Sequence, residues 1–80
     1  MRITIRGKTY SVSKEEVEEK LRDVEPEEER RARYFIEIGG KEFPIKQVLN
    51  QTLNLPKLAF SSQDAFIVLE KLGFEITKRN

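Results

Sequence analysis

The stretch that decides the fold is Gly39-Gly40-Lys41-Glu42-Phe43-Pro44-Ile45-Lys46, continued by Gln47-Val48-Leu49-Asn50-Gln51-Thr52-Leu53-Asn54. Two adjacent glycines are typical of a tight hairpin turn, because such turns need positive φ angles that glycine adopts without strain. The residues that follow predict a short return strand and then a helix. Pro44 is expected as the first helical residue, where its missing N–H is not needed and its φ is already helical.

Strand patterns flank this segment and recur at the N-terminus. Residues 34–38 are rich in aromatic and β-branched types, which favour the strand that enters the glycine turn. Residues 2–5 and 9–12 alternate polar and apolar side chains around Gly7-Lys8, so we expect a first hairpin on a Gly-X turn. The sequence therefore predicts two hairpins.

Two serines, each followed three residues later by an acid, predict helix starts. Ser13 with Glu16 and Ser61 with Asp64 fit the capping-box pattern, and the first of these begins a helix over about residues 14–23.

Gly73 predicts the end of the last helix in a Schellman motif, with Phe74 packed over Leu69 and a strand over residues 74–78. The whole order predicts a single small α+β domain over residues 1–80, with two β-hairpins, about three helices and a C-terminal strand.

A weak internal repeat is visible at an offset of 33 residues. Residues 5–12 match residues 38–45 at their apolar, glycine, lysine and aromatic positions. Two copies of a hairpin followed by a helix explain the match, and so does the general similarity of hairpin turns; the sequence leaves both open.

The composition excludes several classes of protein. Eighty residues are near the lower limit for an unstapled core, and there is no cysteine for a disulfide or thiolate metal site. There is also no histidine, which removes the usual general base and the commonest metal ligand. No apolar run approaches the length of a membrane span, so a cytoplasmic location is expected, with no membrane partner.

Charge is divided along the chain. Residues 13–29 hold nine acidic and three basic residues, a balance of −6, while the net charge is +1. From Phe43 to Gln63 there is no carboxylate. Such a division allows one face to be basic while another is acidic.

The helix after Pro44 carries the strongest functional signal. Its outward positions are expected to be Lys46, Gln47, Asn50, Gln51 and Asn54. Amides can pair with adenine edges and lysines with phosphate, so this surface suits nucleic acid. The expected nucleic-acid-binding residues, with two nearby lysines for phosphate, are Lys41, Lys46, Gln47, Asn50, Gln51 and Lys57. The alternative is that amides are ordinary filler on a helix surface.

Two further charged groups admit two interpretations each. Arg30, Arg31 and Arg33 either extend the phosphate-binding surface or pair with the preceding glutamates, and pairing is the preferred interpretation. The acidic residues of 13–29 either mimic nucleic acid or form a solvated helix face, and the solvated face is preferred. They are Glu15, Glu16, Glu18, Glu19, Asp23, Glu25, Glu27, Glu28 and Glu29.

Catalysis is not expected. The serines have no histidine to activate them, and the sequence contains no phosphate-binding glycine loop and no metal-spaced cluster. We expect no enzyme activity, no cofactor, no metal and no small-molecule substrate.

Part of the sequence resembles the small N-terminal head domains of HNH-type, modification-dependent (McrA-like) restriction endonucleases, over about residues 34–76. The resemblance rests on Gly40-Lys41-Glu42-Phe43-Pro44-Ile45-Lys46, Leu55-Pro56, Phe60-Ser61, Ala65 and Leu69-Glu70-Lys71-Leu72-Gly73-Phe74. It implies an accessory role on DNA without catalysis, with Lys46 as the functional position. The chain departs from that family in having no nuclease module and no histidine to build one.

The expected function is therefore non-catalytic binding of nucleic acid, most simply DNA, through the helix at Pro44. The alternative is a protein-interaction or homodimerisation module, formed through an open hairpin edge or through apolar side chains around Phe60 and Phe66. Phe66 and Ile67 lie off the apolar stripe of the last helix, as happens when a second surface is covered.

Overall fold

The computed structural model describes residues 1–28 and 30–79; Glu29, part of the acidic run, and Asn80 lie outside the described residues. Its elements are β1 (Arg2–Ile5), β2 (Lys8–Ser11), α1 (Lys14–Lys20), β3 (Tyr34–Ile38), β4 (Lys41–Pro44), α2 (Ile45–Leu53), the 3₁₀ helix η1 (Lys57–Ala59), α3 (Ser62–Lys71) and β5 (Thr77–Lys78). The predicted α+β fold, with two hairpins, three helices and a C-terminal strand, is confirmed.

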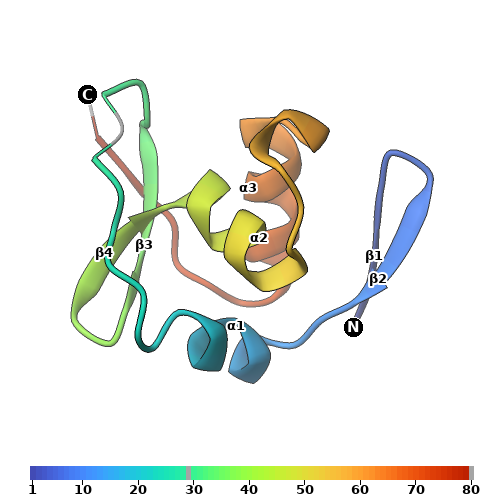
Figure 1. The fold of residues 1–80 in the computed structure, drawn as a ribbon, viewed down its shortest axis with the longest axis horizontal. Helices are drawn as coiled ribbons and strands as arrows, with labels where there is room; N and C mark the ends of the chain where they lie inside the picture. The colour runs from blue at the N-terminus through green and yellow to red at the C-terminus, as the bar shows by residue number, and fades with distance from the viewer. Residues whose placement is uncertain (29, 80) are drawn as a thin grey trace.

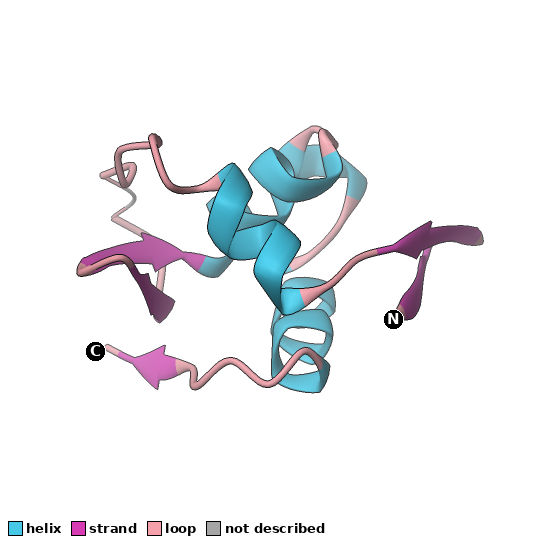
Figure 2. Ribbon diagram, turned by 90° about the horizontal axis from the view of Figure 1, so that it is seen from below, coloured by secondary structure: helices cyan, strands magenta, loops and turns pink. Residues whose placement is uncertain are grey.

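Two small antiparallel sheets lie at opposite ends of the molecule, with the helices between them (Figure 1). One is the β1–β2 hairpin, and the other has the strand order β4-β3-β5. Figure 2 shows the same division from below, with the three-stranded sheet near the C-terminus and the hairpin near the N-terminus. None of the helices in the described part of the chain is long and apolar enough to cross a bilayer.

Both hairpins turn on two consecutive residues with positive φ. These are Arg6 and Gly7, at 50° and 83°, and Gly39 and Gly40, at 60° and 80°. Positive φ at both central residues defines the type I′ turn, whose twist matches that of the flanking strands. The first turn is thus one residue earlier than the Gly-X turn predicted, and Lys8 already belongs to the return strand.

The two turns and the two return strands match at the 33-residue offset seen in the sequence, since β2 and β4 begin and end at equivalent positions. Each hairpin is followed by a helix. The internal repeat is therefore a repeat of structure, whatever its origin.

Pro44 ends β4 and does not open the helix. It pairs with Phe35 in the sheet register, and its ψ of 138° is extended. The prediction that Pro44 is the first helical residue is wrong, because a φ near −60° suits a strand end as well as a helix, and the strand ladder decides ψ. Helix α2 begins one residue later, at Ile45.

The first helix ends at Lys20, three residues before the predicted end at Asp23. Leu21, with φ −99° and ψ 1°, leaves the helical region and turns the chain, while its side chain is 1 % exposed. Burial of Leu21 against the core thus fixes where the chain leaves the helix.

The predicted caps of α3 are present. The Ser61 Oγ accepts a hydrogen bond from the Asp64 N–H at 3.1 Å, and the Asp64 carboxylate accepts one from the Ser61 N–H at 2.9 Å. At the other end Gly73 has φ 96°, and the Phe74 N–H donates to the Leu69 carbonyl at 3.1 Å, as a Schellman motif requires.

The C-terminal strand is shorter than predicted. Among the described residues, Thr77 and Lys78 form the strand that pairs with β3. The Arg79 N–H extends this contact by donating to the Arg33 carbonyl at 2.6 Å.

Helix α2 is the centre of the molecule. It contacts α1, α3, η1, β3 and β4, so little of its surface reaches solvent. Two of its side chains, Val48 and Leu49, are among the largest fully buried side chains of the described residues. The others are Phe43, Phe60, Leu21, Ile36, Leu69, Val12 and Val17. This central position decides which of the predicted site residues remain accessible.

Candidate nucleic-acid interface

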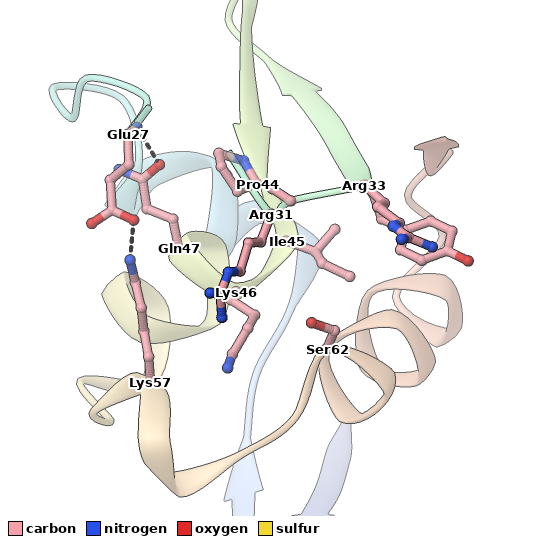
Figure 3. A pocket seen from close by; sticks show the side chains of 11 residues that line it. Glu27, Arg31, Arg33, Pro44, Ile45, Lys46, Gln47, Lys57 and Ser62 are labelled. Atoms are coloured by element: carbon pink, nitrogen blue, oxygen red, sulfur yellow. Dashed lines mark hydrogen bonds and ion pairs between the residues drawn. The ribbon is translucent and has the colours of Figure 1, made fainter. Parts of the chain in front are cut away.

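A pocket of about 230 Å³ lies at the N-terminal end of α2, between the segment that enters β3 and the start of α3 (Figure 3). It is lined by Glu27, Arg31, Ala32, Arg33, Tyr34, Pro44, Ile45, Lys46, Gln47, Lys57 and Ser62. Among the described residues that line it are four cationic side chains and one carboxylate, so its local charge is positive.

Lys46 lies in the first turn of α2, and its side chain extends into the pocket (Figure 3). Its Nζ lies 5.7 Å from the centre of the Phe60 ring, within the range of a cation–π contact. In residues 1–28 and 30–79, no carboxylate lies within ion-pair distance of this ammonium group. Lys46 thus lies against an aromatic ring and has no ion-pair partner among the described residues.

Arg31 and Arg33 reach the pocket from the segment that precedes β3. Both side chains are exposed, and the backbone of Arg33 is fixed by the hydrogen bond from Arg79. The sequence predicts that this basic cluster pairs with the preceding glutamates, and that interpretation stays a prediction. The two arginines are the candidate residues missing from the predicted set.

The end of α2 itself adds to this positive field. No acidic residue occupies its first turn. The side chain of its N-cap, Pro44, has no atom that could accept a hydrogen bond from the free N–H groups. The N-terminus of a helix carries a partial positive charge and favours anions nearby. The Ser62 hydroxyl turns toward the same space in Figure 3. Cations from two segments and a helix end therefore meet at one place.

Residues 24–28, which we call the acidic connector, bring carboxylates close to lysines of the predicted site. Lys57 Nζ forms an ion pair with Glu27, and Lys41 Nζ lies 3.0 Å from Glu25 Oε1 and 3.3 Å from the Val24 carbonyl oxygen. The sequence from Phe43 to Gln63 contains no acid, but in the fold the carboxylate of Glu27 lies beside Lys57 of this stretch.

Gln47 is buried, with 2 % of its surface exposed. Its Oε1 accepts a hydrogen bond from the Glu27 N–H at 2.9 Å, and its Nε2 donates to the Glu25 carbonyl at 2.8 Å. The prediction that Gln47 faces outward is wrong, because its amide satisfies the backbone of a segment some twenty residues away.

The remaining predicted residues separate into two groups. Lys46, Gln47 and Lys57 line the pocket, whereas Lys41, Asn50 and Gln51 do not. Asn50 is half-buried, and its Nδ2 donates to the Leu55 carbonyl at 2.5 Å, which ties down the chain after the helix. Gln51 is exposed. The predicted stripe along the helix is therefore not one continuous surface.

Asp64, near the start of α3, has a pKa below the ordinary value of aspartate. The main cause is the hydrogen bond from the Ser61 N–H, helped by the Ser61 hydroxyl and by the charge of Arg6. Within residues 1–28 and 30–79, no group of three potential metal ligands gathers closely enough to hold a metal ion.

The apolar side chains considered for a dimer surface are mostly internal. Phe60 is 2 % exposed, and Phe66 packs edge-on against Tyr34, with ring centres 5.2 Å apart. In the described part of the chain the large apolar side chains that remain exposed are Met1, Leu58 and Ile67, with Leu58 at 96 %.

Comparison with known proteins identifies the family of this chain and says nothing of its ligand. No curated protein matches the chain, and no solved structure does. A family model described as SCO5918-like matches residues 1–80, the whole sequence. The resemblance of residues 34–76 to head domains of HNH-type restriction endonucleases is therefore wrong as an assignment; it rested on short motifs that the present fold uses for a turn, a strand end and a Schellman motif. The chain belongs to the SCO5918-like family.

Proposed function

We propose that this protein is a non-catalytic nucleic-acid-binding module, with DNA as the expected form, and that phosphate binds at the pocket beside the start of α2. One observation carries the proposal: Lys46, Arg31 and Arg33 come from two segments of the chain and line the same pocket. Phosphate contacts of this kind supply essentially all of the non-specific affinity of a protein for nucleic acid, and they carry no sequence information.

The expected set of contacts is narrower than the sequence suggested. Lys46 and Lys57 are retained, and Arg31 and Arg33 are added. Gln47 is excluded because both ends of its amide are used inside the protein. Lys41, Asn50 and Gln51 are at most peripheral, since they do not line the pocket.

Affinity from one protomer is expected to be modest. A few phosphate contacts give weak binding at physiological salt, and useful affinity then needs a second protomer or a tethered partner. Catalysis is not part of the proposal, since the sequence has neither histidine nor cysteine.

The proposal is tested by retention on DNA-cellulose at low salt. We expect the double variant Lys46→Glu/Arg33→Glu to lose retention, because phosphate would face two carboxylates. The matched control is Lys20→Glu/Lys71→Glu, which makes the same change in net charge at exposed positions in the last turns of α1 and α3. Equal retention of the two double variants would remove the proposal.

A second candidate, a protein-interaction module, is favoured by Leu58. This side chain is 96 % exposed on η1, where a leucine gains nothing from the fold of the monomer. If it anchors a homodimer, light scattering will give twice the monomer mass, and Leu58→Ser will return the protein to a monomer. A wild-type protein that stays monomeric at high concentration contradicts homodimerisation.

A further inference from the structure

We propose, resting on the function above, that the pocket at the start of α2 receives one unstacked base, so that the natural ligand is a single strand of nucleic acid and not a duplex. The inference names the form of nucleic acid, which neither the sequence nor the cationic side chains specify. It depends on what the pocket offers besides charge.

The pocket has an apolar part as well as a charged one. Pro44 and Ile45 are both buried, Ile45 at 3 % exposure, and Tyr34 is half-buried beside them. Arg31 and Arg33 are exposed by contrast. The apolar residues therefore lie deeper than the arginines, an arrangement that suits a ligand with a flat apolar body and a negatively charged edge. A simple phosphate ion would make no use of this apolar lining.

Tyr34 supplies an aromatic ring in a fixed orientation. Its ring packs edge-to-face against Phe66, with the centres 5.2 Å apart and the planes at 77°. Its backbone is held in β3, where it pairs with Lys78. A ring that is already immobilised loses little freedom when a base stacks on it. Stacking on aromatic side chains is the usual way in which proteins bind single strands.

The size of the pocket fits one ring system. A cavity of about 150 Å³ holds benzene, whereas pockets for whole drug-sized ligands begin at about 300 Å³. The value here, about 230 Å³, lies between them. A single base therefore fits the hollow, while its sugar and phosphate stay at the exposed rim, beside Arg31 and Arg33.

A duplex presents its bases differently. They are stacked and paired inside the helix, and extracting one costs a few kcal/mol, a cost that a single strand does not meet. A hollow between two protein segments also admits only the edge of a duplex, so phosphates alone would touch the protein. The geometry thus predicts a preference for the single strand beyond what charge gives.

The test uses three fluorescently labelled probes and fluorescence anisotropy at low salt. They are a dodecamer of thymidine, a dodecamer of the same length with abasic sugars throughout, and the duplex of the thymidine dodecamer with its complement. The two single strands carry equal numbers of phosphates and differ only in their bases. We expect the thymidine strand to bind about tenfold more tightly than the abasic strand, the usual contribution of a stacked base. It should also bind more tightly than the duplex.

Two variants test whether the base stacks on Tyr34. Tyr34→Leu should reduce the affinity for the thymidine strand about tenfold while leaving the abasic strand unchanged. Tyr10→Leu, which alters the other partly buried tyrosine on the distant hairpin, should change neither. The probe comparison on the wild-type protein needs no variant to fold.

The outcomes separate the two proposals. Equal binding of the thymidine and abasic strands, or a duplex bound at least as tightly as the single strand, overturns the base pocket while phosphate binding stands. Absence of binding to all three probes overturns the proposed function together with the base pocket.

Discussion

Gln47 and Glu27 are joined by a hydrogen bond of 2.9 Å, in which the backbone N–H of Glu27 donates to the buried Oε1 of Gln47. The Nε2 of Gln47 donates to the Glu25 carbonyl at 2.8 Å, so the Gln47 side chain satisfies two backbone groups of the acidic connector. The connector is thereby held against α2. This contact also places the carboxylates of Glu25 and Glu27 beside Lys41 and Lys57.

Replacing Gln47 by leucine should lower the free energy of unfolding by about 1 to 3 kcal/mol, because two backbone groups lose their partner. Gln51→Leu, on the same helix but exposed, is the control and should stay within about 0.5 kcal/mol of the wild type. Urea unfolding followed by circular dichroism measures both. Similar values for the two variants would mean that the Gln47 amide does not hold the connector.

Neutralising Glu27 should strengthen binding to a polyanion. Glu27→Gln removes the only carboxylate among the described residues of the pocket and releases Lys57 from its ion pair. We expect an increase in affinity for the thymidine dodecamer of up to about fivefold at low salt, the size of one close charge pair in water. Glu18→Gln, on the exposed face of α1, changes net charge equally and lies outside that pocket. If both variants bind alike, net charge alone explains the gain.

The hydroxyl of Ser61 should matter for stability more than that of its neighbour. Ser61→Ala removes the acceptor for the Asp64 N–H and should cost about 1 kcal/mol. Ser62→Ala keeps the cap and increases helix propensity inside α3, so little or no loss is expected. Thermal unfolding of the two variants measures these changes in stability. A loss of stability in Ser62→Ala as large as that in Ser61→Ala would contradict the observed cap.

Asp64 should make the cap depend on pH. Its pKa in the folded protein is lowered, chiefly by the Ser61 N–H, so the folded state binds this proton less readily than the unfolded state. The stabilisation is therefore present above the ordinary pKa of aspartate, about 3.9, and is lost as pH falls through the lower pKa of the folded state.

The corresponding measurement compares wild type with Asp64→Asn in urea unfolding from pH 7 down to pH 2. The difference in stability should be largest near neutral pH and shrink in acid. Asp23→Asn, at an exposed position in the turn after α1, serves as the charge-matched control. A difference between wild type and Asp64→Asn that does not change with pH would mean that the ionised carboxylate is not what caps the helix.

Local rules predicted much of this fold. The glycine pair of the second hairpin, the box at Ser61 and the Schellman glycine at Gly73 each depend on a few adjacent residues, and each is present. The first and last residues of the helices and strands were harder to predict. Proline at position 44 fits either a strand end or a first helical turn, and only pairing with Phe35 distinguishes them.

The site was harder to predict, because its residues act through contacts distant in sequence. Gln47 looks like a surface residue on a helical wheel, yet its partners lie some twenty residues earlier in the connector. Whether Lys57 is paired depends on the same contact. Arg33 was visible as part of a basic cluster, but nothing in the sequence indicates that it shares a pocket with Lys46. Which charged side chains lie close enough to neutralise one another depends on the fold, and it cannot be predicted from neighbouring residues in the sequence.

The most direct test of the central claim is the dependence of affinity for the thymidine dodecamer on salt concentration, measured for wild type, Lys46→Gln and Lys20→Gln. For single strands the slope of log affinity against log salt is about −0.7 per phosphate neutralised. If Lys46 neutralises one phosphate in the pocket, Lys46→Gln will make the slope shallower by about 0.7, while Lys20→Gln will match wild type. Identical slopes for Lys46→Gln and wild type, or wild-type binding that ignores salt, would contradict the account.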